Sequence, residues 1–161
     1  MLLANKKFIG VISAALIAGV AVFEGTKTQP YYDIANIPTV CTGHTGKDID
    51  MDKLYTIEEC RSILVKDLQK HSKGVLECIQ TPIKQSEYDA YTMFAFNVGV
   101  NSFCTSRANK LLSQGQHIAA CNALSTSPNG QPAWSYAAGK YVPGLQSRRL
   151  YERDMCLKDL K

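Results

Sequence analysis

Two acidic residues, Glu24 and Asp33, stand nine residues apart, and a hydroxyl residue, Thr39, follows six residues after Asp33. Two carboxyl groups facing each other across a cleft can hydrolyse a glycosidic bond. One is protonated and acts as a general acid, while the other is ionised and activates water or supports the cationic transition state. A hydroxyl such as that of Thr39 can orient the water. Taken alone, the spacing fits two solvated surface acids equally well, so the surrounding elements must decide.

Glu24 directly follows an uncharged apolar segment, residues 8–23, which Lys6 and Lys7 precede. A basic flank before an apolar run is typical of an export signal, and it places the following chain outside the cytoplasm. As a helix the run would be about 24 Å long, shorter than a hydrocarbon core of about 30 Å. We therefore expect an export signal or a weak anchor. A signal peptide cleaved after Ala21 and a buried helix of a cytosolic protein are the alternatives.

The six cysteines all lie beyond the apolar segment and are even in number, which agrees with export into an oxidising compartment. They form no CxxC pair and have no Cys/His spacing typical of zinc, so no metal site is expected. Sequential pairing closes loops of moderate length and is the expected connectivity; six buried free thiols are the alternative. The expected pairs are Cys41–Cys60, Cys78–Cys104 and Cys121–Cys156.

The composition fits one globular domain. The 161 residues are 45% hydrophobic and 20% charged, which argues against a disordered chain, a collagen-like repeat and a coiled coil. The net charge is +4, and from Val22 onward 16 basic residues face 14 acidic ones. This balance is too weak for a nucleic-acid-binding domain, although it would suit an anionic polymer or surface.

Residues 25–52 are rich in Gly, Pro, Thr and Asp and predict an irregular β-hairpin or small sheet. Thr56 and Glu59 form a capping box, which predicts a helix from there to about His71. The expected fold is α+β: a small β-containing part and a mostly helical lobe, with a ligand cleft between them. Further helices are predicted over residues 85–98, 106–113, 118–124 and 145–160, with a loop over residues 125–132.

The region around Glu24 resembles the active-site region of the phage-type lysozymes, glycoside hydrolase family 24. That family has a Glu that ends the first helix, then a Y-x-D motif, a Thr and a G-H-T-G motif. The resemblance spans about residues 16–157. The matching residues are Glu24-Gly25, Tyr31-Tyr32-Asp33, Thr39, Gly43-His44-Thr45-Gly46, Tyr55-Thr56, Gln85, Tyr88-Asp89-Ala90, Phe94 to Gly99, Trp134, Gly144-Leu145, Arg148-Arg149 and Glu152-Arg153.

The resemblance implies a lysozyme-like fold and a monomeric muramidase without a cofactor. Such an enzyme cleaves the β-1,4 bond between N-acetylmuramic acid and N-acetylglucosamine in peptidoglycan and so lyses the host cell. It implies Glu24 as the general acid, Asp33 as the residue that activates water and Thr39 as a residue that holds this water, with inversion at the sugar carbon. Tyr32 and Asn97 are candidate substrate-binding residues, and Asn97 fits a helix cap equally well. A lytic transglycosylase and a non-catalytic wall-binding protein are the alternatives.

Several other residues have a structural and a functional interpretation. In the family the position of His44 is structural, and we expect it to pair with Asp67 on the following helix. Trp134, the only tryptophan, is expected in the core, with a role at the cleft as the alternative. For Arg148 and Arg149 a solvated helix face competes with pairing to acids or contact with an anionic glycan. His71 and His117 are expected to be ordinary surface residues.

The position of Glu24 directly after the apolar segment implies that this segment has two roles. In the family, the helix that this Glu closes belongs to the folded domain, so residues of about 16–23 must both insert in the membrane and pack in a protein. This resembles the signal-anchor-release endolysins. We expect residues 1–23 to be a signal-anchor that also supplies the first helix, and residues 24–161 to be the catalytic domain. The enzyme would be exported, tethered to the inner membrane on its periplasmic side, and then released into the periplasm.

Overall fold

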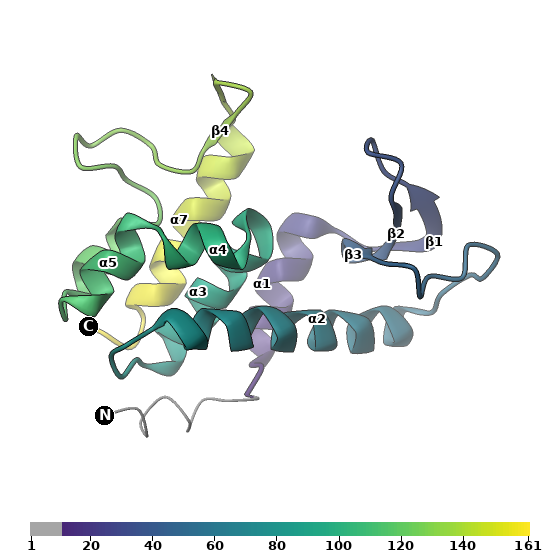
Figure 1. The fold of residues 1–161 in the computed structure, drawn as a ribbon, viewed down its shortest axis with the longest axis horizontal. Helices are drawn as coiled ribbons and strands as arrows, with labels where there is room; N and C mark the ends of the chain where they lie inside the picture. Colours follow the sequence, from purple (N-terminus) through teal and green to yellow (C-terminus); the bar gives the residue numbers. More distant parts are fainter. Residues whose placement is uncertain (1–10) are drawn as a thin grey trace. The chain divides into compact units, whose positions relative to one another are not determined.

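The computed structural model describes residues 11–161, and their chain forms two compact units. Residues 12–70 make up the first unit, and residues 71–161 make up most of the second. Figure 1 shows the order of the elements along the chain. The first unit holds α1, one small sheet and the first part of α2, whereas the second unit is mostly helical. The structure therefore confirms the α+β class.

Helix α1 runs from Ala14 to Glu24. It begins at Ser13, whose Oγ accepts a hydrogen bond from the backbone N–H of Leu16 at 3.0 Å, a typical N-cap. It ends at Gly25, whose φ of 67° lies in the region that glycine tolerates best. The helix is apolar on every side and buries Leu16, Gly19 and Val20. Among residues 11–161 no helix combines the length and the apolar character needed to cross a membrane.

The sheet of the first unit has three antiparallel strands in the order β1-β2-β3. These are β1 (Lys27–Tyr32), β2 (Pro38–Cys41) and β3 (His44–Thr45), so the predicted β region is present. The central strand β2 buries Thr39, Val40 and Cys41. Around it a small core forms from Val40, Cys41, Ile49 and Cys60, and the Cys41–Cys60 disulfide ties the sheet to α2.

Helix α2 runs from Ile57 to Cys78 and starts at the predicted capping box. Thr56 Oγ1 accepts from the Glu59 N–H at 3.1 Å, and Glu59 Oε2 accepts from the Thr56 N–H at 2.8 Å. The predicted end near His71 was wrong by about two turns. The helix passes through Gly74, where a Cβ would lie 2.8 Å from Val100 Cγ1. Glycine at this position permits close packing inside the helix.

The second unit is built around α3 (Gln85–Val98), whose bounds agree with the prediction, and α7 (Pro143–Leu157), which packs against it. The short helices α4 (Val100–Cys104), α5 (Arg107–Ser113) and α6 (His117–Asn122) follow α3. The sequence did not indicate α4 or the hairpin of β4 (Tyr136–Ala137) and β5 (Lys140–Tyr141). The core of this unit contains mainly large apolar side chains, including Tyr88, Tyr91, Met93, Phe94, Phe103 and Leu112.

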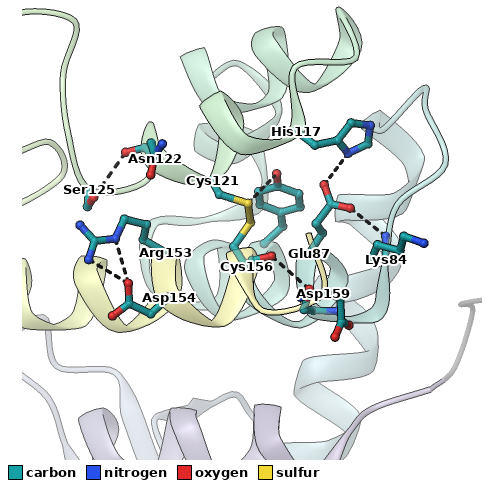
Figure 2. Close-up of a disulfide and its surroundings, with 12 residues drawn as sticks. Lys84, Glu87, His117, Cys121, Asn122, Ser125, Arg153, Asp154, Cys156 and Asp159 are labelled. Atoms are coloured by element: carbon teal, nitrogen blue, oxygen red, sulfur yellow. Dashed lines mark hydrogen bonds and ion pairs between the residues drawn. A yellow bond between two sulfur atoms is a disulfide. The ribbon is translucent and has the colours of Figure 1, made fainter. Parts of the chain in front are cut away.

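Two more disulfides lie in the second unit. Cys78, the last residue of α2, is bonded to Cys104 of α4, and Cys121 of α6 is bonded to Cys156 of α7 (Figure 2). Together with Cys41–Cys60 they make the sequential pairing expected from the sequence, and none of the six cysteines in the described part of the chain stays free. Each cross-link restricts the unfolded chain and so stabilises the fold.

A buried charge cluster joins α7 to the end of α3. Arg149 is fully buried, and its Nη2 donates to Asn97 Oδ1 at 2.7 Å, while its guanidinium lies over the Phe94 ring at 4.9 Å. Glu152, also fully buried, accepts from the Nε of Arg148 at 3.3 Å and forms an ion pair with Arg149 at 3.1 Å. Pairing with an acid is therefore correct, and the solvated alternative is wrong, because both arginines are buried and each pairs with Glu152.

Candidate active site

Glu24 is the last residue of α1, and its side chain is exposed. An acidic side chain at a helix C-terminus meets the negative end of the helix dipole, which is unfavourable. Helix stability therefore does not account for a glutamate at this position. Two residues later, the hydroxyl of Thr26 lies 3.2 Å from that of Thr42, just beyond β2. This contact ties the segment that follows Glu24 to the sheet of the same unit.

Asp33 lies in the turn between β1 and β2 and holds that turn together. Its Oδ1 accepts hydrogen bonds from the backbone N–H groups of Ala35, at 2.8 Å, and Ile37, at 2.9 Å. Its own N–H donates to the Ile37 carbonyl at 3.0 Å. The other carboxylate oxygen, Oδ2, has no hydrogen-bond partner among residues 11–161. One oxygen therefore fixes the orientation of the carboxylate, and the second remains available.

Thr39 is buried on the central strand β2, opposite Tyr31 on one side and Thr45 on the other. Its hydroxyl donates to the Ile37 carbonyl at 3.0 Å, so the proton of the hydroxyl is committed to the backbone. The oxygen can still accept a hydrogen bond. Asp33 and Thr39 are thus both hydrogen-bonded to the main chain of Ile37, and the structure brings these two predicted residues together.

The two candidate substrate-binding residues belong to different units. Tyr32 is the last residue of β1, pairs with Pro38 and is 58% exposed. Asn97 lies near the end of α3, and its amide oxygen is the acceptor for Arg149 described above. The oxygen of Asn97 therefore has a structural role, and its amide NH2 is the group that remains for a ligand.

His44 lies between two aspartates in the first unit. Its Nδ1 is 2.8 Å from Asp67 Oδ2, and its Nε2 is 3.1 Å from Asp48 Oδ2. Burial opposes the charged imidazolium, but the hydrogen bonds and charges of Asp67 and then Asp48 outweigh burial and raise the pKa of His44 above 6.5. A Cβ on Gly46 would collide with Asp48 Oδ1, so glycine at this position leaves room for the second contact.

Sequence reasoning missed a second histidine–carboxylate pair, which Figure 2 shows. His117 of α6 is not an ordinary surface residue, because its Nδ1 lies 2.6 Å from Oε1 of the fully buried Glu87. Glu87 also accepts from the Lys84 N–H at 2.8 Å and so caps α3. No local sequence signal indicates this pair, because His117 lies 30 residues beyond Glu87 along the chain.

Trp134 packs against the core, as the sequence predicted, and is also partly exposed. Its ring meets the buried Phe94 ring edge-on at a centroid distance of 5.3 Å, yet the residue is 41% exposed. His71 also has a ring contact, with Phe96 at 5.1 Å.

Residues 11–161 contain no group of three or more His, Cys, Asp or Glu side chains arranged to hold a metal ion.

We predict that His44→Asn destabilises the protein mainly at low pH and leaves most of the specific activity. The pKa of His44 is raised on folding, so the stabilisation from its charged form is complete below pH 6.5 and is lost as the pH rises through the raised value. Chemical denaturation at about pH 5.5 and pH 8.5 tests this. An equal loss of stability at both pH values, or a large loss of activity in a folded variant, would contradict it.

Comparison with known proteins indicates the same family as the sequence motifs. The sequence pattern of the family described as phage lysozyme matches residues 21–152. A protein named SAR-endolysin from Bacteriophage PS119 is 40% identical over 134 residues, which cover 83% of this chain and 76% of that protein. A SAR-endolysin from Pseudomonas phage phiKMV is 36% identical over 159 residues, covering 96% of this chain and 93% of that protein.

Among solved structures, a mutant of P22 lysozyme is similar with a TM-score of 0.78 and 29% identity, covering 91% of this chain and 98% of that one. The family pattern spans Glu24, Asp33 and Thr39 as well as the α3–α7 core. The chain therefore belongs to the phage lysozyme family and is a lysozyme.

Proposed function

We propose that this lysozyme is an endolysin that hydrolyses the β-1,4 bond between N-acetylmuramic acid and N-acetylglucosamine in peptidoglycan. Membership of the family supports a muramidase, and the relatives named SAR-endolysin support a role in host lysis. The observation that carries the chemistry is the turn after β1, where the Ile37 backbone orients both Asp33 and Thr39.

In the proposed mechanism Glu24 gives its proton to the glycosidic oxygen as the bond from that oxygen to the sugar C1 breaks. A water held by Asp33 Oδ2 attacks C1 from the opposite face, and Asp33 takes the proton that the water loses. Because the Thr39 proton is engaged by Ile37, the Thr39 oxygen accepts the second water hydrogen. Attack by water on the face opposite the leaving group inverts the configuration at C1.

We further propose that residues 1–23 act as a releasable signal-anchor, with residues 24–161 as the catalytic domain. Support comes from α1, whose apolar side chains occupy every face although only Leu16, Gly19 and Val20 are buried. Such a helix has no polar stripe that would oppose insertion into lipid. The enzyme would be exported, held at the periplasmic side of the inner membrane, and released to reach peptidoglycan.

We predict that Glu24→Gln lowers the rate of lysis of purified sacculi by at least about 100-fold, because the amide cannot donate the proton that the leaving oxygen needs. Glu58→Gln is the matched control, since Glu58 is an exposed glutamate in the first turn of α2. Its lysis rate should equal that of the parent. Lysis by Glu24→Gln at the parental rate would refute the assignment of the general acid.

Asp33→Asn should lower kcat at least about 100-fold while the hairpin stays folded. The Asn oxygen can still accept from Ala35 and Ile37, but it cannot take a proton from water. Thermal unfolding within about 2 °C of the parent would show that the turn persists. Full activity of the folded variant would favour a lytic transglycosylase, which needs no base to activate water.

Replacing Ala14, Ala15 and Ala18 by Leu should delay lysis of the producing cell. All three side chains are exposed in the folded enzyme, so the substitutions should strengthen insertion into lipid more than they disturb the fold. The time to lysis and the share of protein in the membrane fraction are measured. The purified variant should digest isolated sacculi at the parental rate. If lysis in cells began as early as with the parent, the release proposal would fail.

A further inference from the structure

The hairpin of β4 and β5 carries two tyrosines on one face. Tyr136 and Tyr141 are cross-strand partners, so their side chains leave the hairpin on the same side, whereas Ala137 and Lys140 share the other side. Their ring centroids are 5.9 Å apart at an interplanar angle of 65°. The residues are 50% and 48% exposed. A pair that served only the core would be covered, and this pair is half open to solvent.

The base of the hairpin is fixed to the second unit. Ser135 is fully buried, its carbonyl accepts from the Val142 N–H at 2.8 Å, and its hydroxyl donates to Gln146 of α7. The neighbouring Trp134 packs on Phe94 of α3, as described above. Figure 1 shows the hairpin extending from the start of α7. A two-stranded ribbon is marginal by itself, so these contacts hold the tyrosines in a defined position.

The charge of this part of the chain favours an anionic partner. From Ala90 to Tyr151 the sequence contains no Asp or Glu. The exposed cations of the same stretch are Arg107, Lys110 and Lys140, whereas Arg148 and Arg149 are buried beside Glu152. Peptidoglycan carries carboxylates, and the hairpin has one cation, Lys140, and no acid that would repel them.

We propose that Tyr136 and Tyr141 form a glycan-binding ledge, on which the pyranose rings of peptidoglycan stack. The face of an aromatic ring is electron-rich and attracts the C–H groups on one side of a sugar ring, while the phenol hydroxyl can bond to sugar hydroxyl or amide groups. The ledge rests on the proposed function, since it presumes a peptidoglycan substrate. It holds the polymer and takes no part in bond cleavage.

The test measures binding to purified sacculi by sedimentation in a Glu24→Gln background, where cleavage does not remove the ligand. The double variant Tyr136→Thr/Tyr141→Thr removes both rings but keeps residues that favour strands. We expect it to bind at least about tenfold more weakly. The matched control Tyr136→Phe/Tyr141→Phe keeps the rings and should bind within about threefold of the parent. Thermal unfolding of all three proteins shows whether the hairpin change affects the fold.

A second readout separates the ledge from a merely structural role. With Glu24 restored, the Thr variant should show a higher KM on sacculi and a kcat within about twofold of the parent. Equal binding by the Thr variant and the parent would overturn the ledge, even if the parent lyses sacculi. Lysis that persists in Glu24→Gln, or that the parent never shows, would instead overturn the proposed function. Weak binding by both the Thr and the Phe variants would place the effect on the hydroxyl groups and contradict ring stacking.

Discussion

The candidate chemistry of this chain depends on one residue's backbone, that of Ile37. Its N–H and carbonyl engage both Asp33 and Thr39, so a backbone group orients an acid and a hydroxyl at once. A turn held only by its own side chain would be weak, but this one opens onto strand β2, which is central in the sheet and bonded to α2 through Cys41–Cys60. The disulfide and the small core around it therefore support the orientation of the carboxylate.

The proposed role of Glu24 as the general acid places a second constraint on α1, which ends at this residue. Before Glu24 the helix contains apolar residues alone, and many of them are small. The proposed signal-anchor requires one segment that suits both a bilayer and a protein, and a run of apolar residues that buries no charge meets this requirement. The same proposal requires that the free-energy difference between the membrane-inserted and the folded state be small.

The sequence predicted those features that depend on neighbouring residues. The bounds of α3 follow from Gly99 at its end, and the start of α2 follows from Thr56 and Glu59. Features that depend on distant partners were missed. The partner of His117 is Glu87, which is far away in sequence, and nothing near His71 in the sequence indicates that α2 continues to Cys78. At the candidate site the residue types followed from the family motifs, whereas the common anchor at Ile37 required the structure.

The central claim is that water held by Asp33 attacks the sugar carbon directly, on the face opposite the leaving group. The most direct test is the anomeric configuration of the new reducing end, followed by NMR in the first minutes of digestion, before mutarotation. Inversion of a β-linked substrate gives the α-anomer first, which is the result that this account predicts. An initial β-anomer would indicate a covalent or otherwise retaining route and would contradict the role given to Asp33.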